Sequence, residues 1–547
     1  MDGRLIIENK RFQTSEKIKS LNPATLESVS EACLANSKEC QQALQAAKKA
    51  FPGWKELPYK QKKEIFLRAK HILLQRSSEV AHLITTEKGM PFSESLSTEV
   101  ETVLEALDYY THILSDALKP KQIKHHVVLF TNKKSSFHFQ PLGVTLIISP
   151  WNFPFMIPFY DILGALAAGN TMVFRPSTST PFCGLVIGEI FIEAGLPPGV
   201  LNIVPCRISQ AEELVLNPEI QTILFTGSVP TGKRIMELAS RNLTKVVLEL
   251  GGKDPMVVLK DADLERAARG AVWAAFMNSG QSCASVERLY VERAIADEFI
   301  ERVMNRTKEL KVGNPIEPGV DIGPMANLSQ LQVVEDHVKD ALNKGAQLLC
   351  GGKRLKKMPG YFFPPTVLSE VNHGMEIMKE ETFGPVLPVM TFTEPEEAVS
   401  LANDSRYGLT ASVWTRSKKM AAWMAERIEA GTITVNDHMF SFVEPGAIWG
   451  GIKQTGRGYT HGPFGLQELV NIKFVSFDFS KKRKQIWWYP YEQDFSHFME
   501  KSLTFFHHNR LRKKIVAMFS LLSHWSRIKA GTQVTNFIKS LPRIFSK

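Results

Sequence analysis

Five short apolar runs between residues 144 and 250 constrain the fold more than any other feature of this sequence. The runs are VTLIIS, TMVF, LNIV, TILFT and KVVLEL, at residues 144–149, 171–174, 201–204, 222–226 and 245–250. Segments of helical character, such as TPFCGLVIGEIFIEAG, separate them. Strands that are apolar on both faces and alternate with helices form parallel sheets covered on both sides. We therefore expect a doubly wound α/β domain that binds a nucleotide.

A second alternation of strands and helices runs from about residue 286 to residue 436. Its apolar runs are RLYV, FGPVLPVMTF, LTASVWT and GTITVN, which predict a second α/β domain. Residues 38–90 read as helical instead, because apolar side chains recur there at i, i+4, i+7 and i+8. These side chains are Ile65, Ala69, Ile72 and Leu73. A chain of 547 residues has room for two or three domains.

The six cysteines are scattered, with no CxxC pair and no His-rich cluster near them. This spacing argues against a disulfide framework and against a metal site, and it favours a reducing compartment. The N-terminal sequence MDGRLIIENKRF has no apolar core of a signal peptide, and no stretch of about 18 uncharged apolar residues follows. We therefore expect a cytoplasmic protein without a membrane-spanning helix.

Five segments beside the expected strands contain residues that can do chemistry. They are SPWNFP at 149–154, FTGSVPTG at 225–232, LELGGKDP at 248–255, MNSGQSCASVERLYV at 277–291 and ETFGPV at 381–386. Taken singly, each has an ordinary structural explanation. Prolines stiffen a turn, a serine begins a helix whose free N–H groups can bind phosphate, and a free cysteine usually packs in a core.

Taken together, these segments resemble the aldehyde dehydrogenase superfamily from about residue 20 to residue 475. The shared motifs are PWNFP, FTGSxxxG, ELGGK, GQxC, ExFGP and GGxKxxGxG, in this order, with 34 residues from Glu249 to Cys283. The resemblance implies an α/β fold with a doubly wound nucleotide-binding domain, an α/β catalytic domain and a β oligomerisation arm. The implied boundaries are 1–121 with 143–250 for the first domain, 251–462 for the second, and 122–142 with 463–480 for the arm.

The resemblance also implies NAD- or NADP-dependent oxidation of an aldehyde to the carboxylic acid. Cys283 would attack the carbonyl carbon as a thiolate, giving a thiohemiacetal and then a thioester, so that one hard step becomes two easier ones. The Asn152 amide and the Cys283 N–H would stabilise the oxyanion. Glu249 would activate the water that hydrolyses the thioester. A nearby helix N-terminus or the cationic nicotinamide would lower the pKa of the thiol.

By the same resemblance, ten residues are expected around the cofactor and four around the substrate. The cofactor residues are Trp151, Arg175, Ser177, Thr178, Gly227, Ser228, Gly232, Gly251, Glu381 and Phe383. The substrate residues are Phe153, Tyr160, Met277 and Trp449. All four are apolar or aromatic, which favours an apolar medium-chain, long-chain or aromatic aldehyde.

The chain departs from the family pattern in two places. The usual Lys-Pro-Ser/Ala-Glu reads here RPST, from Arg175 to Thr178, so the acid that repels a 2′-phosphate is absent and NADP use is open. Many relatives carry Gly-Arg-Glu where this chain has Gly458, Tyr459 and Thr460. That change puts in doubt any role of the missing acid in a proton or water relay.

Three alternatives stay open at this point. The first two are a CoA-acylating aldehyde dehydrogenase, against which Glu249 argues, and a semialdehyde dehydrogenase. The third is a membrane-bound scaffold that keeps the fold without activity, against which the Cys-Asn-Glu set argues. The exposed edges of a β arm need a partner, so we expect a homodimer or homotetramer.

The basic character of the chain is confined to residues 481–547. This extension holds 14 Lys and Arg against 3 Asp and Glu, while the whole chain has a net charge of +10. It begins KKRKQIWWYPY, and LRKKIVAMFSLLSHWSRIK follows with apolar residues at helical spacing. These are Leu511, Ile515, Phe519, Leu522 and Trp525, beside Arg512, Lys513, Lys514, Arg527 and Lys529. Basic and aromatic residues around a short apolar helix favour peripheral contact with an anionic membrane over nucleic-acid binding. A tail packed on the protein itself is the alternative.

Overall fold

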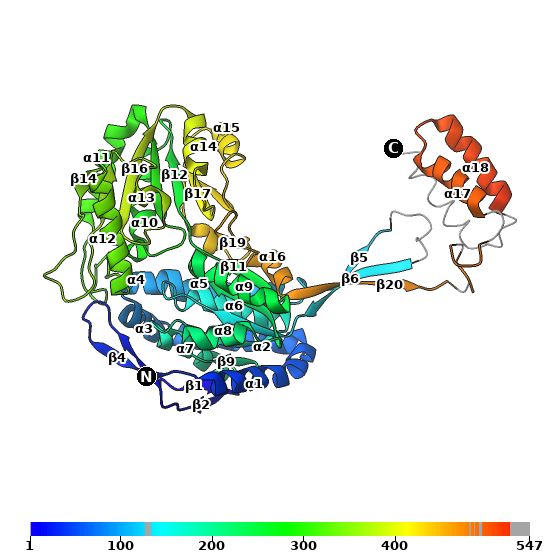
Figure 1. Ribbon diagram of the computed structural model, residues 1–547, viewed down its shortest axis with the longest axis horizontal. Coiled ribbons are helices and arrows are strands. Elements are labelled where there is room, and N and C mark those ends of the chain that lie inside the picture. Colours follow the sequence, from blue (N-terminus) through cyan, green and yellow to red (C-terminus); the bar gives the residue numbers. More distant parts are fainter. Residues whose placement is uncertain (1, 126–132, 481–482, 486, 492–494, 526–547) are drawn as a thin grey trace. The chain divides into compact units, whose positions relative to one another are not determined.

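The computed structural model describes residues 2–125, 133–480, 483–485, 487–491 and 495–525. It divides into two compact units (Figure 1). The first comprises Met1–Ala117 and Pro141–Asn471, and the second comprises Leu118–Gln140 and Ile472–Lys547. Each unit has its own secondary structure and is described separately.

An eight-stranded sheet in the first unit contains all five strands expected from the apolar runs. They are β7 (Val144–Ile148), β8 (Thr171–Arg175), β9 (Leu201–Ile203), β10 (Ile220–Thr226) and β11 (Lys245–Glu249). They are parallel and lie in the order β11-β10-β7-β8-β9. The chain therefore starts in the middle and winds outward in both directions, which confirms the doubly wound α/β fold.

Three edge strands of this sheet were not expected. β1 (Leu5–Ile7) and β2 (Lys10–Phe12) extend one edge beyond β9, and β19 (Gly456–Arg457) pairs antiparallel with β11 at the other. β19 comes from the segment 251–462, so that segment contributes strands to both sheets.

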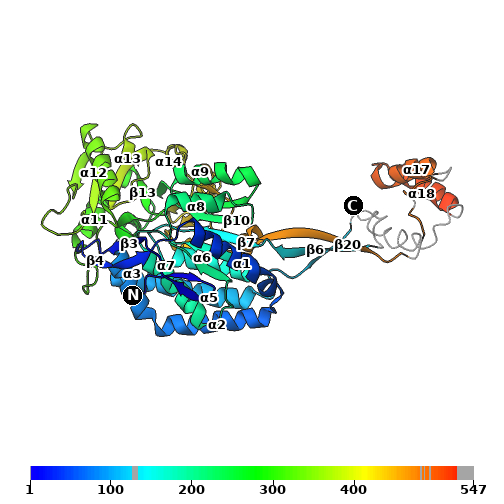
Figure 2. The same cartoon turned by 60° about the horizontal axis from the view of Figure 1, so that its bottom comes forward.

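Helices cover both faces of this sheet (Figure 2). Buried residues of α1, α8 and α9 pack on one face and contribute to one core with Leu146, Val173 and Ile223. The wholly buried helix α6 and the helix α7 lie against β7, β8 and β9. The helices of this region are α1 (Ser37–Glu56), α2 (Tyr59–Gln75), α3 (Ser77–Lys88), α4 (Phe92–Glu94), η1 (Ser95–Val100), α5 (Glu101–Ile113), α6 (Met156–Ala168), α7 (Pro181–Glu193), α8 (Ile208–Val215), α9 (Val229–Ala239) and η3 (Ser240–Asn242).

A second sheet of seven strands has the order β14-β15-β16-β13-β12-β17-β18. All its pairs are parallel except β14 with β15. The strands are β12 (Asp254–Val258), β13 (Val286–Glu292), β14 (Gln347–Cys350), β15 (Thr366–Ser369), β16 (Val386–Phe392), β17 (Thr410–Trp414) and β18 (Thr432–Val435). The helices are α10 (Leu264–Phe276), η4 (Met277–Gly280), η5 (Arg293–Ile295), α11 (Ala296–Glu309), α12 (Leu328–Asn343), α13 (Glu376–Lys379), α14 (Pro395–Asn403), α15 (Lys418–Ala425), η6 (Phe440–Phe442) and α16 (Gly462–Glu468). A separate hairpin joins β3 (Lys17–Leu21) and β4 (Ser28–Cys33).

The second unit contains a three-stranded sheet and two helices. The strands are β5 (Lys121–Ile123), β6 (Lys133–Pro141) and β20 (Val470–Asp478), with β6 in the middle. The helices α17 (Phe495–His507) and α18 (Leu511–Trp525) pack against each other. The expected start of the arm at residue 463 was wrong, because α16 is helical and belongs to the first unit. No helix in the described part of the chain is long and apolar enough to cross a bilayer.

Candidate active site

Three segments that are distant in the sequence meet at the carboxyl edge of the first sheet. Glu249 is the last residue of β11, and Asn152 lies in the loop after β7. Cys283 lies between η4 and β13, in the loop that leads into the second sheet. Two adjoining cavities are lined by both Cys283 and Glu249, and the larger one also by Asn152. Parallel strands bring such loops to one edge, which is where α/β folds place their sites.

Hydrogen bonds tie the Asn152 loop to the Cys283 loop. Asn152 Nδ2 donates to the carbonyl of Gln281 at 3.2 Å, and Asn278 Nδ2 donates to the carbonyl of Asn152 at 2.9 Å. The backbone of Asn278 is left-handed, with a φ of 54°. The buried ammonium of Lys88 donates to Asn278 Oδ1, and the carboxyl of Glu94 accepts from the Asn278 N–H at 2.9 Å. The oxyanion-hole candidate is therefore held in place by a buried polar network.

The surroundings of Cys283 favour the neutral thiol over the thiolate. Burial raises its pKa above the usual range, and the carboxyls of Asp254, Glu381 and Glu249 add to the effect. Along the chain, Cys283 follows η4 and precedes the strand β13, so no helix begins at this residue. A positive charge bound beside the thiol, such as the cationic nicotinamide, would lower this pKa.

Glu249 is 5 % exposed, and neither of its carboxyl oxygens has a hydrogen-bond partner among the described residues. Burial raises its pKa well above the ordinary value, and the nearby Asp161 carboxyl raises it further. An unpartnered carboxyl with a raised pKa, facing a cavity beside a thiol, is suited to accept a proton from water.

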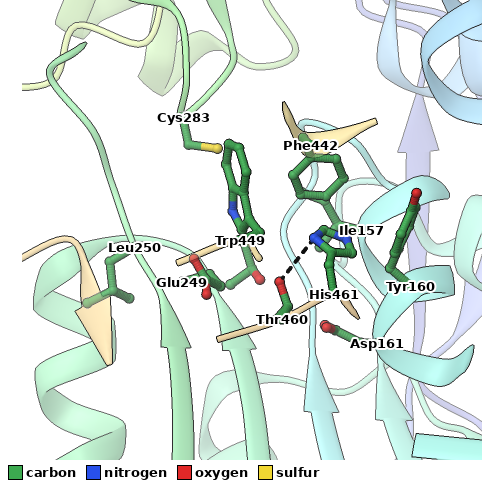
Figure 3. Close-up of a pocket in the computed structure, with 11 residues that line it drawn as sticks. Ile157, Tyr160, Asp161, Glu249, Leu250, Cys283, Phe442, Trp449, Thr460 and His461 are labelled. Carbon is green, nitrogen blue, oxygen red and sulfur yellow. Dashed lines mark hydrogen bonds between the residues drawn. The ribbon is translucent and has the colours of Figure 1, made fainter. Parts of the chain in front are cut away.

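The smaller cavity, of about 20 Å³, combines aromatic rings with acidic groups (Figure 3). Its lining includes Ile157, Tyr160, Phe442, Trp449 and Leu250, together with Asp161, Thr226, Glu249, Cys283, Thr460 and His461. The ring of Phe442 contacts Trp449 and His461, with centroids 4.8 and 4.6 Å apart. Of the four expected substrate residues, Tyr160 and Trp449 line this cavity. Phe153 and Met277 are buried and line neither cavity.

The larger cavity, of about 260 Å³, is lined by six of the ten expected cofactor residues. These are Trp151, Gly227, Ser228, Gly251, Glu381 and Phe383. Glu381 Oε1 accepts the Gly252 N–H at 2.9 Å, and the rings of Trp151 and Phe383 meet edge to face at 5.5 Å. Ser228 is the N-cap of α9, so the free N–H groups of that helix open beside the cavity.

A buried ion pair supports the loop that carries Glu381 and Phe383. Lys253 Nζ contacts the Glu287 carboxylate, and both side chains are buried. Glu287 accepts the backbone N–H groups of Thr382 and Phe383, each at 2.8 Å. Lys253 is therefore structural, because it neutralises the carboxylate that holds this loop.

The other four expected cofactor residues line neither cavity. Arg175 ends β8, and its Nε donates to the carbonyl of Cys206 at 3.2 Å. Ser177 is buried and Thr178 half-buried in the loop that follows. Gly232 lies in the first turn of α9, where a Cβ atom would come within 2.5 Å of Leu250.

Sequence reasoning missed Asp161, Phe442 and His461. Asp161 is the one acid in the otherwise apolar segment FYDILGALAAG, and a lone acid in a buried helix was a signal that could have identified it. Phe442 ends the three-residue helix η6 and His461 directly precedes α16, and neither segment has a periodic pattern. Within the described ranges, no group of three or more His, Cys, Asp or Glu side chains is placed to bind a metal ion.

Comparisons with known proteins agree on one family. A sequence profile of the aldehyde dehydrogenase family matches residues 11–475. The betaine aldehyde dehydrogenase of Bacillus subtilis is 36 % identical over 482 residues, which are 87 % of this chain and 96 % of that protein. The NADP(+) succinate-semialdehyde dehydrogenase GabD of Escherichia coli is 34 % identical over 465 residues, covering 84 % and 94 %.

Solved structures show the same relationship. An NADP-dependent enzyme from E. coli superposes with a TM-score of 0.84 at 33 % identity, covering 87 % of this chain and 98 % of that one. A mutant of the indole-3-acetaldehyde dehydrogenase AldA of P. syringae, in complex with NAD+ and IAA, gives a TM-score of 0.84 at 32 % identity, covering 87 % and 96 %.

Proposed function

This chain belongs to the aldehyde dehydrogenase family and is an NAD(P)-dependent oxidoreductase that acts on aldehydes, and from that premise we propose which of its residues do the chemistry. Cys283 adds to the carbonyl carbon of the aldehyde. The amide of Asn152 and the backbone N–H of Cys283 stabilise the oxyanion that forms. Glu249 then takes a proton from the water that opens the thioester. The cavity shared by Cys283 and Glu249 is the observation that carries this assignment.

The larger cavity would hold the nicotinamide and pyrophosphate part of a dinucleotide. Gly227 has no room for a side chain, since a Cβ atom there would meet the ring of Phe225 at 2.5 Å, and its bare backbone lines the cavity. Gly227 and Ser228 would hold the pyrophosphate at the start of α9, and Glu381 a ribose hydroxyl. Phe383 and Trp151 would line the nicotinamide side. When bound, the oxidised dinucleotide supplies the hydride acceptor and a positive charge near the thiol.

The remaining four expected residues would lie toward the adenosine end. Arg175 and Ser177 would face the ribose phosphate. Thr178 would stand where many relatives have an acid that repels a 2′-phosphate. Gly232 would keep the first turn of α9 close to β11. An arginine near this end tolerates a 2′-phosphate. We therefore propose that the enzyme accepts both NAD and NADP.

The substrate is proposed to be an uncharged apolar aldehyde, aliphatic or aromatic. The small cavity is lined by the rings of Tyr160, Phe442 and Trp449, of which Trp449 lies beside the thiol (Figure 3). Its ionisable groups include the acids Asp161 and Glu249. No lysine or arginine of the described residues lines either cavity. The carboxylate of a dicarboxylic semialdehyde would lose its hydration there without gaining a cation.

A panel of hexanal, decanal, benzaldehyde and succinic semialdehyde, with NAD or NADP, tests this proposal. We expect higher kcat/KM for the first three than for the semialdehyde. Added CoA should leave the rate of NADH formation unchanged, because Glu249 activates water as the acyl acceptor. Preference for the semialdehyde would contradict the substrate proposal, and a requirement for CoA would contradict hydrolysis.

We also propose a division of labour among the domains. The eight-stranded sheet binds the dinucleotide, the seven-stranded sheet supports the Cys283 loop, and the three-stranded sheet is an oligomerisation arm. Phe137, Ile472, Phe474 and Phe477 are exposed on this small sheet, which supports its pairing with a second copy. Light scattering should therefore report a dimer or tetramer, and Phe474→Asp should weaken the association of the subunits. A monomeric parent protein would contradict the arm.

The extension beyond residue 480 is proposed to contact an anionic membrane surface from the cytoplasmic side. On α18, Leu511, Val516 and Phe519 are exposed. Lys501, Arg512 and Lys513 line a groove of about 400 Å³ formed by α17 and α18. Exposed apolar side chains next to cations suit a helix at a lipid interface. The expected positions Arg527 and Lys529 lie outside the described residues, as do the side chains of Leu522 and Trp525.

A further inference from the structure

Two buried polar side chains in the small cavity have no role in the reaction as assigned above. Asp161 projects from α6, and His461 directly precedes α16. Asp161 is 6 % exposed and His461 3 % exposed. Asp161 Oδ2 and His461 Nε2 each have no hydrogen-bond partner among the described residues. Figure 3 shows both side chains near Thr460, on the side of the cavity away from Cys283. Such buried groups require a partner, which an ordered water can provide.

A second small cavity continues from the first. It has a volume of about 10 Å³ and shares Tyr160, Asp161, Thr460 and His461 with the cavity of about 20 Å³ beside Glu249. Tyr459, which is partly exposed, lines its other side. A water molecule needs roughly 10–15 Å³ and two or more polar partners. Each cavity therefore has the size and the polar lining for about one water, with Asp161 on the wall between them.

Glu249 must lose the proton that it receives in each turnover. In the proposed hydrolysis, an O–H bond of water breaks and its proton goes to Glu249, while the oxygen bonds to the thioester carbon. The C–S bond then breaks, and its electron pair stays on the sulfur of Cys283. No electrons are transferred in this half of the reaction. Glu249 is left protonated and buried, with no hydrogen-bond partner among the described side chains.

We propose that Asp161 accepts this proton through a cavity water and so restores the Glu249 carboxylate. The proposal rests on the proposed function, because it needs Glu249 as the base. While Glu249 is ionised, Asp161 holds the one proton that the pair shares, and it releases that proton into the second cavity, toward Tyr459. One water of the first cavity then takes the proton from Glu249 and gives one of its own to Asp161.

The electrostatics support an exchange between these two carboxyls. Burial raises the pKa of Asp161 to about 8, and the charge of Asp161 contributes to the raised pKa of Glu249. Two neighbouring buried carboxyls share one proton more readily than both ionise. Burial lowers the pKa of His461 to about 3, so this ring is neutral and can hydrogen-bond to the bridging water. The other titratable groups that line the two cavities are Cys283, Tyr110, Tyr160 and Tyr459.

The test is Asp161→Asn in the full-length enzyme, with NADH formation followed in a stopped-flow instrument. The measurements run from pH 6 to pH 10, which is about 4 pH units centred on the Asp161 pKa of about 8. We expect the first burst of NADH to keep its amplitude, because hydride transfer does not use Asp161. The steady-state rate should fall by at least about tenfold, because the proton acceptor for Glu249 is lost. The pH dependence of deacylation should also shift to lower pH, because a negative charge beside Glu249 has been removed.

Asp108→Asn on α5 is the matched control and should behave like the parent. If Asp161→Asn does not fold, Asp161→Ser, which leaves space for water, serves for the same measurements. An unchanged steady-state rate and pH profile would overturn the proposal, and so would loss of the burst in a folded variant. The variant Glu249→Gln shows whether the role of Asp161 alone is wrong or the assigned role of Glu249 is wrong as well. If Glu249→Gln accumulates acyl-enzyme while Asp161→Asn resembles the parent, only the role of Asp161 is wrong.

Discussion

A Cβ atom on Gly252 would lie 2.2 Å from the backbone carbonyl oxygen of Cys283, so the turn after β11 packs directly against the loop that carries the thiol. Gly252→Ala must displace one of these two segments. Because a shift of about 1 Å can cost roughly 100-fold in rate, we expect kcat to fall by about that factor. Gly53→Ala, in open space on α1, is the control and should retain activity. Normal kcat in Gly252→Ala would contradict the close packing.

The raised pKa of Glu249 predicts a rate that increases with pH. Only the carboxylate form accepts a proton from water, so deacylation should accelerate as the pH rises through the raised pKa. Glu249→Gln should remove this dependence and slow steady-state turnover by at least about 100-fold. Stopped-flow absorbance should still show an NADH burst near one per active site. A variant without a burst that turns over at the normal rate would show that Glu249 is not the base.

Cofactor choice should depend on Thr178. An acid at this half-buried position would repel the 2′-phosphate of NADP and leave NAD untouched. We expect Thr178→Glu to lower kcat/KM for NADP at least about tenfold more than for NAD. Ser179→Glu places the same charge on the next, exposed residue and should discriminate less. Equal losses with both dinucleotides, or no activity of the parent with NADP, would defeat this assignment.

Membrane contact should depend on the exposed apolar face of α18. The double variant Val516→Asp and Phe519→Asp should lose co-sedimentation with phosphatidylserine vesicles at low salt, because charged groups oppose insertion at the interface. Leu243→Asp, another exposed apolar position, is the control. If the parent stays in the supernatant, or the double variant sediments equally, the extension packs on the protein or has another partner.

The sequence was informative about the centre of each sheet and less so about its edges. The five parallel strands of the first sheet could be predicted because strands buried on both faces are near-continuous apolar runs between helices. β1, β2 and β19 are strands of two or three residues. Their pairing depends on where the N-terminal segment and the segment after η6 return to the sheet, and a local pattern of hydrophobicity does not contain that information.

The same division holds for the site. Motifs pointed to Glu249 and Cys283, and the structure brings both to the same cavities. The cavity walls were harder to predict, because side-chain direction follows from tertiary packing. Phe153 was expected to face the substrate but is buried elsewhere, while Asp161, on the neighbouring helix, lines both small cavities.

The central claim is that Cys283 forms a thioester that Glu249 opens, and intact-protein mass spectrometry of Glu249→Gln tests it most directly. The variant is incubated with NAD and an aldehyde that the parent oxidises, then digested to locate the modification. The account predicts one acyl group per chain on Cys283, present also when Cys350 is changed to Ala and absent when Cys283 is changed to Ala. No acyl adduct, or an adduct on any other residue, would contradict it.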